Sequence, residues 1–271
     1  MDHRPNPALD DDETAQAEDR TAPPARVLHA VLVEQGEEEL KRPIGSLFFS
    51  GLAAGLAIHL SIIAQAALHA ALPNTPWRGV VSDFGYSFGF VILILGRLQL
   101  FTESTVTAVL PLVKRPTLAA FGRTLRLWSI VLIANLIGTF LAALLAVHGV
   151  IATPEQLSAM LDLSAAILKH DAVTNIGLAI PAGFLIASIP WVLIGARESA
   201  FWVIIAVTYG IALGDFGHVV VGSDEAFLLL LAGHATPGQV AAFLLPTLLG
   251  NIIGGSGLFA LLAHGQVKDE I

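Results

Sequence analysis

Six long apolar segments constrain the fold of this chain more than any other feature of its sequence. We place them near residues 45–70, 79–110, 121–149, 173–195, 199–230 and 240–264. About 20 predominantly apolar residues are enough for an α-helix to cross a bilayer. Only 13% of the residues are charged, whereas soluble domains carry about 25%. The sequence therefore predicts an all-α membrane protein with six transmembrane helices.

Polar residues and glycines interrupt two of these segments. The fifth is broken within residues 210–223, where Asp215 and His218 lie among several glycines, and the second is broken within residues 99–105. A bilayer tolerates broken backbone only where it faces protein or a water-lined cavity. An ionisable side chain at that depth is a candidate for function by default. We therefore expect His218 to lie on a transport path.

The sequence contains an internal repeat. The segment that begins at Asn135 resembles the one that begins at Asn251, at an offset of 116 residues. With three spans in each half, the two copies must enter the membrane in opposite directions, which is the inverted-repeat plan of many transporters. The same offset pairs His218 with Thr102, so we expect the two helix breaks to be repeat-related and to face each other.

The two ends of the chain differ in character from the apolar segments. Residues 1 to about 24 are rich in Pro, Asp, Glu and Ala and are expected to be disordered. The spacing of apolar residues over 26–42 predicts an amphipathic helix at the membrane surface, with a solvated linker helix as the alternative. Residues 1–43 thus precede a channel domain over 44–265, and residues 266–271 form a short tail. The distribution of Lys and Arg predicts that both termini are cytoplasmic.

Four short motifs, in order along the chain, resemble those of the formate/nitrite transporter family. They are Leu100-Phe-Thr102, Asn135-Leu-Ile-Gly138, Asp215-Phe-Gly-His218 and Gly250-Asn-Ile-Ile-Gly-Gly255. The resemblance spans roughly residues 40–265 and is greatest to a divergent branch, since Gly217 stands where the family has an acid. It implies an aquaporin-like protomer with two inverted repeats, a pore in each protomer, a homopentamer and the bacterial inner membrane.

The resemblance and the sequence together select five candidate pore residues. His218 is expected to donate a proton or a hydrogen bond to an anion, and Thr102 to fix the His218 tautomer or to donate to the substrate. Phe101, Leu100 and Phe90 are candidates for apolar constrictions. A structural alternative exists for each: His218 could cap a helix end, Thr102 could satisfy loop backbone, and the apolar side chains could serve only in packing.

Two asparagines and a lysine are candidates for supporting roles. Asn135 and Asn251 are expected to brace the two breaks by hydrogen bonds to freed backbone, although a purely structural contact between helices would look the same in the sequence. Lys169 precedes the fourth segment, at the expected outer mouth, where relatives carry a basic residue that attracts anions. An ordinary interfacial lysine is the alternative.

Charged residues stand beside both breaks. Arg97 and Glu103 flank the first, and Asp215 lies in the second. An unpaired charge inside a membrane is costly. We therefore expect Arg97 to pair with Glu103, with Asp215 or with a neighbouring protomer.

The sequence predicts a channel or transporter for small monovalent anions of the formate, nitrite or hydrosulfide class, with proton linkage through His218. The expected partners are lipid, the anion, protons and further copies of the chain. No enzyme, cofactor or metal signature is found, and the net charge of -8 gives no nucleic-acid signal. A channel for small neutral solutes and a non-conducting scaffold or sensor remain as alternatives.

Overall fold

The computed structural model describes residues 23–271, and this part of the chain is helical throughout, without strands. The first half comprises α2 (Ala25–Lys41), α3 (Ile44–Ala71), α4 (Arg78–Ser82), η1 (Asp83–Tyr86), α5 (Ser87–Leu95), α6 (Phe101–Thr107), α7 (Val109–Lys114) and α8 (Leu118–Val147). The second half comprises α9 (Pro154–Ser164), η2 (Ala165–Leu168), α10 (Ala172–Gly195), η3 (Arg197–Ser199), α11 (Ala200–Leu213), α12 (Val219–Leu231), α13 (Pro237–Ile252), η4 (Ile253–Ala260) and α14 (Leu261–Val267). The predicted amphipathic helix corresponds to α2, whereas most of the predicted disordered tail lies outside the described residues.

Within residues 23–271, five helical stretches are long and apolar enough to cross a membrane. They are Ile44–Ala71, Arg78–Leu95, Leu118–Val147, Ala172–Gly195 and Pro237–Val267. The predicted fifth segment is absent from this set because its break divides it into α11, with 14 residues, and α12, with 13. Neither piece alone has the length of about 20 residues that a span requires.

The two breaks repeat the same backbone geometry. Residues 96–100 separate α5 from α6, and residues 214–218 separate α11 from α12. Arg97 and Asp215 occupy equivalent positions and both adopt φ 51°, the left-handed conformation that few residues other than glycine visit. In each break the chain therefore turns sharply out of one helix before the next begins.

The repeat relation within the breaks differs from the offset of 116 that the sequence suggested. Leu100 and His218 are the equivalent residues, since each is the N-cap of the helix after its break. The offset between the breaks differs from the offset between the asparagines because the two halves differ in length here. The chain from the first residue of the helix after the break to the asparagine is shorter in the second half. Asn135 bonds a residue 34 positions earlier, whereas Asn251 bonds one 32 positions earlier. Thr102 is thus not the repeat partner of His218, although the two are in contact.

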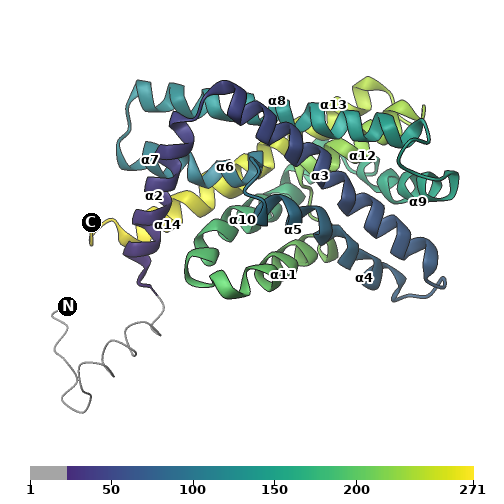
Figure 1. Ribbon diagram of the computed structural model, residues 1–271, viewed down its shortest axis with the longest axis horizontal. Helices are drawn as coiled ribbons and strands as arrows, with labels where there is room; N and C mark the ends of the chain where they lie inside the picture. Colours follow the sequence, from purple (N-terminus) through teal and green to yellow (C-terminus); the bar gives the residue numbers. More distant parts are fainter. Residues whose placement is uncertain (1–22) are drawn as a thin grey trace, which may run out of the picture.

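Different sets of short helices lie at the two ends of the bundle (Figure 1). Helices α2, α7 and α14 pack together at the end that also holds the C-terminus. Helices α4 and α9 lie toward the opposite end. The long helices pack in pairs, α3 against α8 and α10 against α13, and each pair carries one of the asparagines expected to brace a break.

The predicted sixth segment contains a π-helical stretch that the sequence analysis did not anticipate. This stretch, η4, follows α13 directly and includes the Gly254-Gly255 pair. Ser256 in η4 donates a hydrogen bond to the backbone oxygen of Thr105 in α6, at 2.7 Å. Gly255 lies against the Thr105 side chain as well. Widened π turns often occur at functional sites, and this one fixes α6, the helix that follows the first break.

Candidate functional site

Asn135 holds the first break in place with three hydrogen bonds. Its side-chain oxygen accepts from the backbone N–H of Phe101 at 2.9 Å. Its amide nitrogen donates to the backbone oxygens of Gln99 at 2.9 Å and Gly51 at 2.8 Å. The last four carbonyls and first four N–H groups of a helix lack intrahelical partners, and Asn135, which is fully buried, supplies partners for such groups at the break.

Asn251 repeats this arrangement at the second break. Its side-chain oxygen accepts from the backbone N–H of Val219 at 2.8 Å, and its nitrogen donates to the backbone oxygens of Gly217 and Ala179, both at 2.8 Å. The two asparagines thus fix the starts of α6 and α12. Thr102 lies in the first turn of α6, and His218 directly precedes α12. The two asparagines therefore also determine where these two side chains meet.

The side chains of Thr102 and His218 meet in the interior of the bundle. Thr102 Oγ1 lies 2.7 Å from His218 Nε2, and only 0% and 2% of their surfaces are exposed. The other ring nitrogen, Nδ1, accepts from the backbone N–H of Val221 at 3.3 Å, so His218 also caps α12. An acceptor Nδ1 in a neutral ring places the proton on Nε2, which then donates to Thr102. The Thr102 hydroxyl hydrogen remains free to donate elsewhere.

The three apolar candidates surround this pair unequally. The Phe90 ring lies 5.2 Å from the His218 ring, centre to centre, in an edge-to-face arrangement. Phe101 packs instead against Trp128, with ring centres 5.8 Å apart. Leu100 is the N-cap of α6 and is buried. Phe90 is therefore the candidate aromatic residue that contacts the His218 ring, whereas Phe101 contacts Trp128 of α8.

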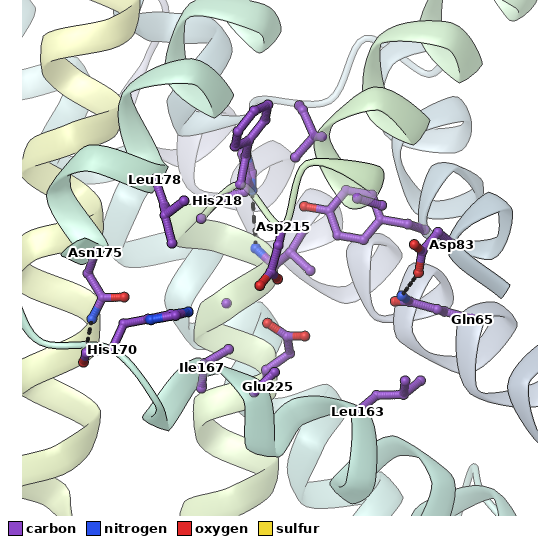
Figure 2. A pocket seen from close by; sticks show the side chains of 18 of the residues that line it. Gln65, Asp83, Leu163, Ile167, His170, Asn175, Leu178, Asp215, His218 and Glu225 are labelled. Carbon is purple, nitrogen blue, oxygen red and sulfur yellow. Dashed lines mark hydrogen bonds between the residues drawn. The ribbon is translucent and has the colours of Figure 1, made fainter. Parts of the chain in front are cut away.

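A cavity of about 350 Å³ reaches His218 from the side of α9 and η2 (Figure 2). Its wall holds the carboxylates of Asp83, Asp215 and Glu225. Asp215 was a candidate from the sequence, whereas Asp83 and Glu225 were not. Both were visible as acids within predicted apolar segments, and that signal could have placed them among the candidates.

Further polar groups in the cavity wall include Gln65, which donates a hydrogen bond to Asp83 at 2.8 Å. His170 and Asn175 line the opposite side (Figure 2). Lys169 is exposed and is not part of this wall, although the next residue is. In this cavity wall the neighbouring His170 takes part instead of Lys169.

Arg97 pairs with neither of the two partners expected within the chain. Within residues 23–271, the side chain of Arg97 makes no salt bridge with Glu103 or Asp215 and is exposed. Arg97 lies in the turn that follows α5, with φ 51°. Glu103 lies partly buried in α6, on the other side of the break. Of the expected partners for Arg97, only a neighbouring protomer remains.

A buried pair that the sequence analysis missed connects α3 to α12. His59 Nδ1 lies 2.6 Å from Asp224 Oδ2, and both side chains are almost completely buried. Ser223, the preceding residue of α12, bonds Thr139 of α8 at 2.9 Å. These contacts hold α12 against two long helices and so fix the helix that His218 caps.

Glu39 connects α2 to the first break. One carboxylate oxygen accepts from the Thr107 hydroxyl at 2.6 Å, and the other from the Gln99 amide at 3.4 Å. Burial raises the pKa of Glu39 above its usual value of 4.5, and these hydrogen bonds only partly oppose the effect. A raised pKa in the docked state means that docking of α2 is strongest below pH 4.5 and weakens as the pH rises through the raised value.

We therefore expect hydrogen exchange at the α2 amides, corrected for intrinsic rates, to accelerate as the pH rises above 4.5. Glu39→Gln should remove most of this dependence and keep α2 protected at neutral pH, because the amide has no charge to desolvate. Glu34→Gln, at an exposed position of the same helix, is the matched control. An equal pH dependence in wild type and Glu39→Gln would contradict the assignment.

Comparison with known proteins agrees with the motifs. Residues 26–265 match the family model described as Formate/nitrite transporter. The chain belongs to the formate/nitrite transporter family. Its relatives include the inner membrane protein YfdC of Escherichia coli, 38% identical over 255 residues, which cover 94% of this chain and 82% of YfdC. The formate channel FocA of Haemophilus influenzae is 24% identical, with 80% of this chain and 84% of FocA covered.

Solved structures of the formate/nitrite transporter family share the fold. An ion channel of the family superposes with a TM-score of 0.77 at 19% identity, over 89% of this chain and 98% of that one. A pentameric formate channel with formate bound gives a TM-score of 0.70 at 16% identity, over 83% and 97% of the two chains. The protein is thus a membrane protein with the fold of these channels.

Proposed function

We propose that this member of the formate/nitrite transporter family carries a small monovalent anion of the formate, nitrite or hydrosulfide class between Thr102 and His218. The observation that carries the proposal is the buried contact of these two side chains, made where the two helix breaks meet. The names of FocA and of the formate-bound channel support the substrate class.

The chemistry of the pair suits a weak acid. A bare anion is costly to move into the apolar surroundings of Phe90 and the helix starts. Nε2–H of His218 and the hydroxyl of Thr102 are the donors that would meet it. When His218 has first taken up a proton, it can transfer that proton to the anion and return to the neutral ring, and the neutral acid crosses. The anion and one proton then move together.

We further propose that the protomer crosses the inner membrane six times, as two inverted repeats with both termini cytoplasmic, and assembles as a homopentamer. The five long apolar stretches together with the α11–α12 pair support the count. The matched breaks and matched asparagine contacts support the repeat. The description of YfdC as an inner membrane protein and of a structural neighbour as pentameric supports the location and the assembly.

Anion flux into proteoliposomes, formate against nitrite, tests the function at pH 5 and pH 7. Asparagine is a strong N-cap residue, so His218→Asn keeps the cap of α12 but removes the titratable ring. We expect wild-type flux to be higher at pH 5 and to fall by roughly 100-fold in His218→Asn, in the range of a lost proton-transfer group. Thr102→Val, in which a methyl group replaces the hydroxyl, should reduce flux without removing its dependence on pH.

The alternatives predict different results. Passage of uncharged solutes such as urea without anion flux would favour a neutral-solute channel. No flux of any solute through a correctly folded protein would favour a scaffold or sensor. Undiminished anion flux in His218→Asn would show that the path avoids the Thr102–His218 pair.

A further inference from the structure

The cavity in front of His218 has a wall of one charge sign. Asp83 comes from η1, Asp215 from the second break and Glu225 from α12, so three separate elements converge. The carboxylates of Asp215 and Glu225 lie near each other in the cavity (Figure 2). No lysine or arginine belongs to the wall, which lies wholly within the described residues. Clefts lined by one sign of charge concentrate ions of the opposite sign.

Two almost buried polar side chains in the same wall have unused hydrogen-bonding capacity. Asn175 is 5% exposed and donates its amide N–H to the backbone oxygen of His170 at 3.4 Å. Its side-chain oxygen has no partner within residues 23–271 and faces the cavity (Figure 2). Tyr86 is 8% exposed, and its hydroxyl makes no hydrogen bond to the described part of the chain. Both groups are reachable from the cavity and lack a protein partner there, so a hydrogen-bonding ligand in the cavity can meet them.

We propose that the cavity binds a small cation with N–H groups, of the ammonium or methylammonium class, between the three carboxylates and the free oxygen of Asn175. Carboxylates and an amide oxygen can only accept hydrogen bonds, and an ammonium group can only donate them. This inference goes beyond the proposed function and does not depend on it. A cation held here would also offset the carboxylates that otherwise repel an anion approaching His218.

The composition of the cavity favours such a cation over a metal ion. Within the described residues, no group of three or more His, Cys, Asp or Glu side chains could hold a metal. Calcium requires six to eight oxygen ligands in close array, whereas these carboxylates are spread around a space of about 350 Å³. Phe216 and Phe243 also line the wall. Aromatic faces attract ammonium groups, so the lining matches an organic cation.

Calorimetric titration of the purified full-length protein with methylammonium chloride tests the proposal. Tetramethylammonium chloride and potassium chloride at equal ionic strength are the reference ligands, since neither has an N–H group. We expect saturable binding of methylammonium and at least about tenfold weaker binding of both references, because charge-assisted hydrogen bonds contribute about 1.5–3 kcal/mol. Equal binding of all three cations, or no saturable binding, would overturn the proposal.

Two variants assign the binding to this wall. Asp215→Asn suits the left-handed φ of 51°, which asparagine tolerates, and Glu225→Gln is close in shape. Each should weaken methylammonium binding about tenfold, whereas Glu198→Gln, exposed in η3, should not. Unfolding temperatures identify any variant that fails to fold. Unchanged binding in both folded variants would overturn the site. Anion flux measured in parallel separates the two proposals, since flux without cation binding would overturn this inference alone.

Discussion

Replacing Asn251 with alanine is expected to destabilise the protein by at least about 3 kcal/mol. The change removes three hydrogen bonds and leaves the N–H of Val219 and the oxygens of Gly217 and Ala179 without their partner. Each buried group left unsatisfied costs about 1–3 kcal/mol. Because Asn251 is fully buried, water cannot easily replace the lost amide. Unfolding of the detergent-solubilised protein, followed by heat or denaturant, measures the effect.

Thr247→Val is the matched control for this variant. Thr247 lies in the same helix, α13, and is equally buried, but its hydroxyl bonds only the backbone oxygen of Phe243 one turn away. Its loss should cost less than about 1.5 kcal/mol. Asn135→Ala should resemble Asn251→Ala, because it removes the equivalent three bonds at the first break. A cost for Asn251→Ala no greater than that of Thr247→Val would refute the bracing role.

Two glycines of α10 are expected to respond to alanine with opposite signs. A Cβ atom added at Gly183 would collide with the backbone of Asn251, so α10 and α13 would have to separate. Overpacking of a tight contact typically costs about 1–3 kcal/mol, and here it would also displace the asparagine that fixes α12. We expect Gly183→Ala to lose at least this much, together with most anion flux.

Gly177→Ala provides the comparison in the same helix. A Cβ atom at Gly177 has nothing within 4 Å. Alanine stabilises a helix interior by roughly 0.5–1 kcal/mol relative to glycine, so this variant should unfold at the same or a higher temperature. Both unfolding temperature and yield of folded protein should therefore separate the two variants. Equal stability of Gly183→Ala and Gly177→Ala would show that the contact between α10 and α13 can relax.

The features that the sequence predicted well are local ones. Apolar segment lengths determine which helices can span a bilayer, and glycine and polar residues within such a segment mark a break. The motifs around Thr102, Asn135, His218 and Asn251 identified the family, and the family match over residues 26–265 confirmed it. The sequence also brought Thr102 and His218 together, although for an incorrect reason, since His218 is equivalent to Leu100.

Arg97 shows the limit of local reasoning about charge. Its charge next to a break predicted an ion pair, because charge in a membrane is costly. Whether a pair forms depends on the direction in which the side chain leaves the backbone, and Arg97, at φ 51°, is exposed. The π-helical stretch η4 was missed for a related reason. A glycine-rich stretch is compatible with several helix types. In the structure this stretch is π-helical, and it contacts Thr105 of α6.

The sequence by itself determined the helical class, the positions of the two breaks and the family, because each depends on residues that are close together in the chain. Only the tertiary structure decided the chemistry around the site. Asp83, Asp215 and Glu225 line one cavity although they lie in three separate elements. Their convergence depends on how helices pack in three dimensions, which no spacing along the chain encodes. The same packing decides which nitrogen of His218 faces Thr102, because Nδ1 accepts from the first turn of α12.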